Sequence, residues 1–282
     1  MKIKDFVFAA KVSEAYSFLR EFGDSAYLIA GGTSTFFMKS RISKIAIDIN
    51  RIPIKGIRKK HGMFEIGACT TIDEILRYRS EGWVLNKVAL HFVNQHVRNI
   101  STIGGNISRV FYWSDFPVAL RVLEGTLKLT DSSAKKANIS ETFHNAPAQR
   151  AVFKNSILEY IEIPQLSKGM GFGYSKETRT ATAFSSTTAS AFVKIEKGLI
   201  SDIKIAIGAV CAFPLRLFKV EDSLKGQKAD CSIAGKIDFA SLSRYKLTPR
   251  EGMTSEYCTH LLKVKISDVI CEAIKDAAGV SK

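Results

Sequence analysis

Two glycine pairs are the residues in this sequence whose type and spacing point most directly to chemistry. The first lies in Ala30–Ser34 and the second in Thr102–Asn106. Glycine has no Cβ to block a positive φ or a close approach, so backbone N–H groups can converge on an anion and nearby hydroxyls add donors. Each loop alone is more often a tight turn. Together they predict a diphosphate site, because a dinucleotide needs donors from more than one side.

Neither loop follows the common phosphate-binding patterns. The G-x-G-x-x-G pattern of the Rossmann dinucleotide sites is absent from both, and neither loop clearly opens a long helix. The G-x-x-x-x-G-K-[ST] pattern of P-loop nucleotidases is absent as well. The residues therefore favour a different kind of two-loop phosphate site.

The elements around the first loop are predicted to be short. A helix capped by Ser13 runs to about Arg20, and Tyr27–Ala30 is a strand that stops at the first glycine pair. Residues 44–49 alternate like a second strand, and residues 57–68 predict a hairpin that turns at His61-Gly62.

The elements around the second loop mix helices and strands. Thr71–Glu74 has a capping-box pattern that starts a helix. Helical stretches are predicted at residues 83–95 and 116–123, and strands at residues 127–130 and 157–163.

The C-terminal part begins after a predicted linker at residues 165–173. It contains a hairpin of residues 191–195 and 199–210 and a last helix capped at Ser267, with Val269, Ile270, Ala273 and Ile274 facing inward. No βαβ rhythm is visible, so we expect an α+β fold. The expected domains are residues 1–168, with subdomains of about 1–55 and 56–168, and residues 174–282.

Composition narrows the class of protein. The five cysteines are far apart, so we expect reduced thiols, no metal site and no iron–sulfur cluster on this chain. No apolar stretch is long enough to span a membrane and no signal peptide is visible, which predicts a cytoplasmic protein. The net charge of +14 comes from residues spread along the chain. We expect it to serve an anionic ligand or acidic subunits rather than nucleic acid.

The loops also match the motifs of a known family. The chain resembles the FAD-binding (medium) subunits of molybdenum hydroxylases, the xanthine dehydrogenase and carbon monoxide dehydrogenase flavoprotein family. Residues 30–34 match its A-G-G-[TH]-[SD] motif, and residues 102–107 match T-I-G-G-N-[IL] at every position. Asp115-Phe116-Pro117 has the spacing of the family's aspartate, Ile161–Pro164 matches the strand that ends in E-I-P, and Gly173–Arg179 fits its lysine-containing segment.

The match extends more loosely to the C-terminus and has two departures. Phe213–Arg216 and Ser255–Tyr257 look like the family's P-x-R and A-E-Y-R signatures. Residues 108–114 stand where the family usually has Asp-Pro, close to the expected flavin, and Cys258 replaces the usual arginine.

The resemblance implies the roles of individual residues. The diphosphate and ribityl chain of one FAD would be held by the residues Leu28, Ile29, Ala30, Gly31, Gly32, Thr33, Ser34, Thr35, Thr102, Ile103, Gly104, Gly105 and Asn106. Asp115 would accept hydrogen bonds from FAD hydroxyls, and Leu158 and Lys176 would lie near the isoalloxazine. No side chain of this chain would be catalytic and none would bind a metal.

The resemblance also implies the fold and the function. The fold would be a two-subdomain FAD-binding domain like that of vanillyl-alcohol oxidase, followed by a smaller α+β domain. The chain would be the flavin subunit of an oxidoreductase, passing electrons from the 2Fe–2S clusters of a small subunit to NAD or another acceptor, while a large molybdopterin subunit hydroxylates the substrate. Two alternatives stay open: a self-contained FAD-dependent oxidoreductase, and a basic binding module without catalysis.

Several of these residues also have plainer interpretations. Asp115 precedes an apolar helix and could cap it, and a lysine such as Lys176 is usually solvated. His91 and His96 do not share a helix face, so both are expected to be structural or surface residues. Phe111–Trp113 could be buried packing, a cover for the flavin, or a contact with a partner.

Overall fold

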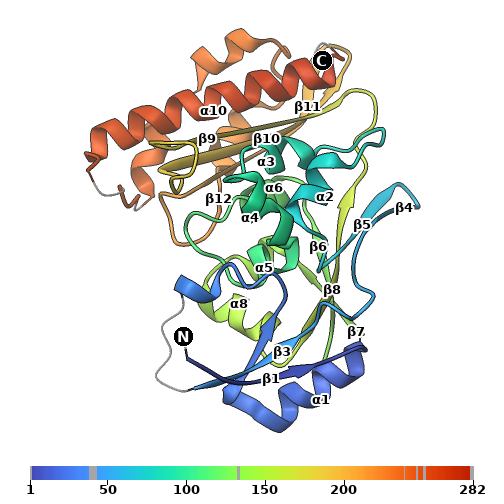
Figure 1. Cartoon of the computed structure of the whole chain (residues 1–282). Helices are drawn as coiled ribbons and strands as arrows, with labels where there is room; N and C mark the ends of the chain where they lie inside the picture. The colour runs from blue at the N-terminus through green and yellow to red at the C-terminus, as the bar shows by residue number, and fades with distance from the viewer. Residues whose placement is uncertain are drawn as a thin grey trace. The chain divides into compact units, whose positions relative to one another are not determined.

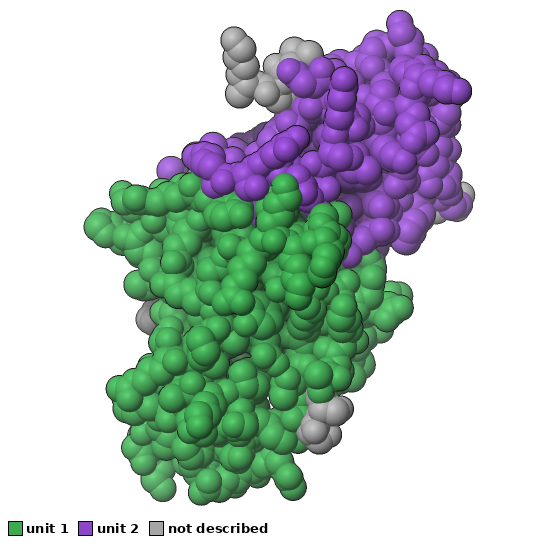
Figure 2. Space-filling model, turned by 90° about the vertical axis from the view of Figure 1, so that its right-hand side faces the viewer, with its two compact units in different colours: residues 1–78, 94–109, 125–164 green, residues 79–93, 110–124, 165–282 purple. Residues whose placement is uncertain are grey.

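The computed structural model describes residues 2–37, 43–131, 134–237, 239–245, 247–249 and 252–279. The chain forms two compact units, which Figure 2 shows in different colours. Unit 1 consists of Met1–Tyr78, Asn94–Arg109 and Gly125–Pro164, and unit 2 of Arg79–Val93, Val110–Glu124 and Gln165–Lys282. Two segments from the first half of the sequence therefore belong to the same unit as the C-terminal half.

Unit 1 begins with a small parallel sheet. Its strands are β1 (Ile3–Phe8), β3 (Lys44–Asp48) and β2 (Ala26–Ile29), in the order β1-β3-β2. The helix α1 (Val12–Phe22) contacts β2 and β3. The predicted strands before the first loop and at residues 44–49 are confirmed, whereas the N-terminal strand β1 was not predicted.

The second sheet of unit 1 is antiparallel and five-stranded. Its order is β4 (Ile57–Lys60), β5 (Met63–Gly67), β8 (Ile157–Pro164), β6 (Thr126–Thr130) and β7 (Ala134–Asn138). The predicted hairpin turn is confirmed, since His61 and Gly62 both have positive φ, 49° and 73°. β8 lies in the middle of the sheet between β5 and β6, which explains its strong apolar signal (Figure 1).

Apart from α1, the α-helices of unit 1 are short, and each is capped by a side chain. They are α2 (Ile72–Arg77), α4 (Gln95–Ile100), α5 (Ile103–Ser108), α7 (Ile139–Thr142) and α8 (Ala146–Phe153). The predicted capping box of α2 is confirmed, because the Thr71 hydroxyl accepts the Glu74 N–H and the Glu74 carboxylate accepts the Thr71 N–H. The helix expected at residues 83–95 is shorter: α3 (Leu85–Leu90) ends before Val93, whose φ is 28°.

Unit 2 is built on a four-stranded antiparallel sheet in the order β12-β11-β10-β9. Its strands are β9 (Met170–Glu177), β10 (Thr187–Glu196), β11 (Leu199–Gly208) and β12 (Leu215–Arg216), and its helices besides α3 are α6 (Phe116–Val122), α9 (Phe218–Leu224), η3 (Cys231–Lys236), η4 (Phe239–Arg244) and α10 (Ser255–Ala277). Gly171 and Gly173 of β9 lie so close to α10 that a Cβ on either would overlap the helix backbone. Gly208 of β11 faces Val118, so α6 covers the opposite face of the sheet.

Two predictions for this unit need correction. Residues 165–173 are not all linker, because β9 begins at Met170 and pairs with β10. The last helix begins at Ser255 and is capped by Thr254, so Ser267 lies within it. The four residues that were expected to face inward are all buried. The early start was missed because exposed charged residues interrupt the apolar pattern in the first turns.

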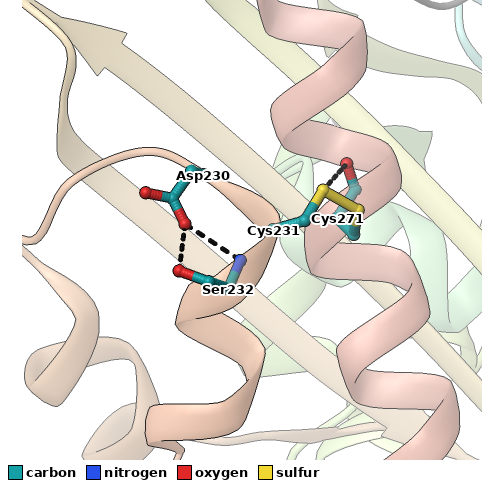
Figure 3. Close-up of a disulfide and its surroundings, with 4 residues drawn as sticks. All are labelled: Asp230, Cys231, Ser232 and Cys271. Atoms are coloured by element: carbon teal, nitrogen blue, oxygen red, sulfur yellow. Dashed lines mark hydrogen bonds between the residues drawn. A yellow bond between two sulfur atoms is a disulfide. The ribbon is translucent and has the colours of Figure 1, made fainter.

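A disulfide joins η3 to α10. Cys231 and Cys271 are 40 residues apart in the sequence but their Cα atoms are 4.7 Å apart, and their sulfur atoms are bonded (Figure 3). The expectation that all the thiols are reduced is therefore wrong for this pair, while Cys69, Cys211 and Cys258 are free cysteines. Sequence spacing could not show a pair that only the packing of η3 on α10 brings together. A cross-link that closes a loop of this size contributes roughly 2–4 kcal/mol of stability.

Within the described ranges, none of the helices is both long and apolar enough to cross a membrane. The same residues contain no group of three or more histidine, cysteine, aspartate or glutamate side chains arranged to bind a metal ion.

Candidate functional site

The first glycine loop follows β2 and carries backbone N–H groups that have no acceptor among the residues the structure describes. Gly32 has a φ of 68°, and its carbonyl accepts the Thr35 N–H at 3.1 Å and the Thr35 hydroxyl at 2.7 Å. Among the described residues, no acceptor contacts the N–H groups of residues 31–34. These residues are half-buried. The loop therefore offers a run of donors to an anion.

The second glycine loop differs, because its N–H groups are already bonded within the chain. The N–H groups of Ile103 and Gly104 donate to the carbonyls of Thr70 (3.0 Å) and Ala68 (2.9 Å). Those of Gly105 and Asn106 donate to the hydroxyl and the carbonyl of Thr102, both at 3.1 Å. A Cβ on Gly104 would lie 2.6 Å from the Ala68 carbonyl oxygen. Glycine is needed here for close packing.

The two loops meet inside unit 1. A Cβ on Gly31 would overlap the carbonyl oxygen of Ile100, the last residue of α4, just before the second loop. The hydroxyls of Thr33 and Ser101 form a hydrogen bond at 3.1 Å. The structure therefore brings together two segments that are 68 residues apart in the sequence.

The β8 segment that contains Leu158 is connected to the second loop through Glu159 and Ala68. The Ala68 N–H donates to the Glu159 carbonyl at 2.8 Å, and the Ala68 carbonyl in turn accepts the Gly104 N–H. The pairing of β8 with β6 shifts register at this point, between Lys128 and Leu129. Leu158 itself is buried. The three unit 1 segments expected at the site are thus held together by backbone hydrogen bonds and one hydroxyl pair.

In unit 2 the structure places Asp115 beside Lys176. Asp115 precedes α6, but its side chain makes no capping hydrogen bond to the helix. Its carboxylate accepts the Tyr174 hydroxyl at 2.6 Å and lies 3.3 Å from the Lys176 Nζ. The side chains of Asp115 and Lys176 are only 4% and 9% exposed. Neither plainer interpretation holds: Asp115 is not a cap and Lys176 is not a solvated lysine.

The electrostatics of this cluster follow from its burial. Burial raises the pKa of Asp115, while the charge of Lys176 and the hydrogen bond from Tyr174 act to lower it. Burial and the neighbouring carboxylate raise the pKa of Tyr174 well above its usual value, so its hydroxyl stays a donor. Burial and Lys176 lower the pKa of His91, against the opposite effect of Asp115. The cluster places the Asp115 carboxyl group and the Lys176 amino group 3.3 Å apart and away from water.

The aromatic residues before Asp115 form a stack. Trp113 is stacked against Phe111, with ring centroids 4.7 Å apart, and against Phe184 at 4.2 Å, and Tyr112 meets its edge at 4.5 Å. The Phe111 N–H donates to the Ser114 hydroxyl at 3.0 Å, which closes the turn. The segment that departs from the family's Asp-Pro pattern is therefore an ordered aromatic turn.

Arg216, in the predicted P-x-R signature, has a structural role. Its guanidinium binds Glu221 through two contacts of 2.6 Å, and its Nη1 donates to the Arg121 carbonyl at 3.4 Å. All three residues are buried. This ion pair links β12 and α9 to the end of α6, the helix that Asp115 precedes.

Three contact residues of these segments were not predicted from the sequence. Tyr174 hydrogen-bonds to Asp115, Thr188 hydrogen-bonds to Tyr174, and Ala68 contacts Gly104 of the second loop. For Tyr174 a signal existed, since residues two apart on a strand share a face and Tyr174 lies two residues before Lys176. Nothing in the sequence indicated Thr188 or Ala68.

The residues of each unit, taken separately, fit a part of an FAD. In unit 1 the first-loop N–H groups that lack an acceptor in the described ranges, with the hydroxyls beside them, suit a diphosphate. In unit 2 a buried carboxylate suits hydroxyl groups. Asp115 is held by a neutral donor and a cation, so it can remain an acceptor.

Comparison with known proteins agrees with this fit. Residues 1–166 match the family model described as the FAD binding domain in molybdopterin dehydrogenase, and residues 172–273 match the C-terminal domain of the CO dehydrogenase flavoprotein. The glyceraldehyde dehydrogenase medium chain of Sulfolobus acidocaldarius is 31% identical over 254 residues, which cover 86% of this chain and 88% of that one. The carbon monoxide dehydrogenase medium chain of Hydrogenophaga pseudoflava is 27% identical over 212 residues, 73% of this chain and 74% of that one.

A solved structure has the same fold. A chain of the reconstituted CO dehydrogenase from Oligotropha carboxidovorans superposes with a TM-score of 0.89 at 22% identity, covering 98% of this chain and 99% of that one. The expected α+β architecture, an FAD-binding domain followed by a smaller C-terminal domain, is confirmed. The chain belongs to the FAD-binding flavoprotein family of the molybdenum hydroxylases, the family of the carbon monoxide and xanthine dehydrogenase medium chains, whose cofactor is FAD.

Proposed function

We propose that this chain is the electron-transfer subunit of a molybdopterin-dependent hydroxylase or dehydrogenase. It would work with a small subunit that carries 2Fe–2S clusters and a large subunit that carries the molybdopterin. Bound FAD would supply the redox chemistry, taking electrons from the clusters and passing them to NAD or another acceptor. The observation that supports a cofactor-holding role best is the first loop, whose N–H groups at residues 31–34 have no acceptor among the described residues.

The two glycine loops would have different tasks in binding FAD. We assign the diphosphate to the first loop, because its N–H groups and hydroxyls are the donors at hand. The second loop would shape the site through its backbone and through contacts with Ile100 and Ser101. Leu158 would border the site from β8.

The charged pair in unit 2 would bind the rest of the cofactor. Asp115 would accept hydrogen bonds from FAD hydroxyls, and Lys176 would place a positive charge near the isoalloxazine. A lysine there favours added negative charge on a flavin, which is one way in which proteins tune a cofactor. No residue of this chain acts as a nucleophile or a general base in this proposal.

The partners are proposed from the relatives and from the charge. Two of the similar proteins are medium chains of dehydrogenases, and others are named as an FAD-binding subunit of xanthine dehydrogenase and a subunit of caffeine dehydrogenase. The chain has a net charge of +14. A surface of this sign favours docking on acidic subunits.

Purification of the tagged chain from its own cells tests the proposal. We expect it to come with FAD, molybdenum and iron in one complex, measured by flavin absorbance and metal analysis of the same fraction. Adding NAD or oxygen to the substrate-reduced complex then identifies the acceptor from the rate of flavin reoxidation.

Each other outcome contradicts a different part of the proposal. Isolation with FAD but without molybdenum and iron would indicate a self-contained flavoenzyme. Isolation without FAD, together with no binding of added FAD, would indicate a binding module. Full flavin occupancy after Gly104 and Gly105 are both replaced by valine would contradict the assignment of the loops.

A further inference from the structure

Tyr174 is the closest partner of Asp115, and the FAD assignment gives it no role. Its hydroxyl donates to the Asp115 Oδ1 at 2.6 Å, whereas the Lys176 Nζ lies 3.4 Å and 3.3 Å from the two carboxylate oxygens. The first distance is that of a strong hydrogen bond to a carboxylate, and the others are those of a looser ion pair. Tyr174 therefore fixes one oxygen of the carboxylate, and Lys176 mainly supplies charge.

Tyr174 is itself held by three other elements. The Thr188 side chain on β10 hydrogen-bonds to its hydroxyl. Its backbone N–H donates to the Glu272 carboxylate of α10 at 3.1 Å. β9 is an edge strand, and this carboxylate takes the place of a neighbouring strand's acceptor. His91 directly follows α3, and the centroid of its ring lies 5.8 Å from that of the Tyr174 ring. The Glu272 contact holds the backbone of Tyr174, and the phenol cannot turn away from Asp115 without losing its contacts with Thr188 and His91.

Two successive hydrogen bonds connect the Thr188 side chain to the Tyr174 hydroxyl and that hydroxyl to the Asp115 carboxylate. Thr188, Tyr174 and Asp115 are 2–3% exposed. Residues 174 and 176 share a face of β9, and the register pairs Lys176 with Thr188 across the sheet. Because the phenol cannot easily ionise when it is buried beside a carboxylate, Tyr174 keeps its proton and donates it in the hydrogen bond to Asp115.

The charge of the carboxylate depends on few groups. Lys176 and Tyr174 on β9 and His91 after α3 face Asp115, and Glu272 and Lys265 of α10 lie around His91. Burial opposes ionisation of Asp115. A hydrogen bond to a buried charged group is equivalent to about one to two pKa units. Loss of the Tyr174 hydroxyl would therefore raise the pH below which Asp115 becomes neutral.

We propose that Tyr174 is a positioning residue, which orients Asp115 and keeps its carboxylate ionised beside Lys176, with Thr188 behind it. The inference rests on the proposed FAD site and deepens it, because it names the residue that prepares Asp115 as a charged acceptor for the cofactor's hydroxyls. An ionised acceptor makes stronger hydrogen bonds than a neutral one.

The first experiment needs no cofactor. Carboxyl carbons of ¹³C-labelled aspartate are titrated by NMR in the flavin-free full chain, and the Asp115 signal is identified by its absence in Asp115→Asn. We expect the inflection to move upward by about one to two pH units in Tyr174→Phe and by less in Thr188→Val. Tyr245→Phe is the matched control, because Tyr245 packs on the core of the same unit and no described residue hydrogen-bonds to its hydroxyl.

The second experiment measures the dissociation constant of FAD between about pH 5 and about pH 9. Between the two inflections Asp115 is neutral only in Tyr174→Phe, so we expect FAD to bind roughly tenfold more weakly there than to the unaltered chain. At higher pH the affinity of the variant should recover. A role in packing alone would weaken binding equally at every pH.

The outcomes separate this inference from the proposed function. An unchanged Asp115 inflection in Tyr174→Phe overturns the role of Tyr174, even if FAD binds normally. A shifted inflection in a chain that binds no FAD supports the contact but refutes the proposed function. A loss of FAD affinity in Tyr174→Phe that does not depend on pH overturns the link between Tyr174 and the ionisation of Asp115.

Discussion

The two glycine loops are similar as sequence and different as structure. Both place a glycine pair between an apolar residue and hydroxyl or amide side chains. In the first, the N–H groups of residues 31–34 have no acceptor among the described residues. In the second, those of residues 103–106 all donate to Ala68, Thr70 or Thr102.

The difference shows that a glycine-rich motif can either offer backbone N–H donors to a ligand or allow close packing that supports a neighbouring loop. Gly31 lies against the Ile100 carbonyl, so the scaffold of the second loop sets the position of the first. A change in the first loop should therefore weaken binding, together with stability where it disturbs the contact with Ile100, and a change in the second should affect stability before it affects binding.

The largest effect is expected for Gly31→Ala. The added Cβ overlaps the Ile100 carbonyl oxygen, and backbone on both sides must move. We expect the free energy of unfolding to fall by about 3 kcal/mol. FAD affinity should fall roughly 100-fold as two or more donors are displaced.

Gly105→Ala is the matched control for this change. Its added Cβ would lie 3.1 Å from the Thr102 hydroxyl oxygen. Gly105 lies within α5, and alanine is a better helix former than glycine. Urea unfolding and flavin fluorescence titration compare the two variants. Equal losses in both would contradict the distinction between the loops.

A smaller effect is expected when the cap of the second loop is removed. In Thr102→Val the Gly105 N–H loses its acceptor, which costs about 1 kcal/mol of stability. Because this N–H does not take part in binding in our assignment, the dissociation constant of FAD should not change. Measuring both quantities on one preparation tests this, and a weakened affinity at unchanged stability would show that the second loop also donates to the ligand.

The scaffold should also be sensitive to acid through Glu74. Thr71 forms a β-bridge with Thr102, and its backbone N–H donates to the Glu74 carboxylate. Burial alone would raise the pKa of Glu74, but the hydrogen bonds from Thr71 and the nearby Lys55 lower it below its usual value. The stability that it contributes is therefore complete above the ordinary pKa of 4.5 and is lost as the pH falls through the lowered folded value.

Thermal unfolding between about pH 7 and about pH 3 measures this loss. We expect the melting temperature of Glu74→Gln to depend less on pH in this range than that of the unaltered chain. Parallel curves for the two proteins would exclude the carboxylate as the source.

The smallest effect concerns the hydroxyl pair between the loops. A double-mutant cycle with Thr33→Val and Ser101→Ala should give a coupling of about 0.5–1 kcal/mol in the free energy of unfolding, as expected for one partly buried hydrogen bond. Additive losses would mean that the loops are held only by the contact of Gly31 with Ile100.

Strong local patterns predicted much of the fold. The hairpin at His61-Gly62, the Thr71 capping box and strand β8 follow from turn chemistry, capping and β propensity, which act within a few residues. The predictions failed where packing overrides local preference. Gly171 and Gly173 indicated a linker, yet they lie in β9, which pairs with β10. Glycine is required at both positions because α10 passes too close for a side chain.

The sequence by itself determined the family and the types of residue at the candidate site, because the two glycine motifs and Asp115 keep a fixed order along the chain. Only the tertiary structure decided which N–H groups remain for a ligand, since hydrogen-bond partners such as Ala68 come from distant segments. It also decided that Asp115 is buried with Tyr174 and Lys176, and that Cys231 is bonded to Cys271. Contacts between distant residues depend on how whole elements pack, and short sequence patterns do not contain that information.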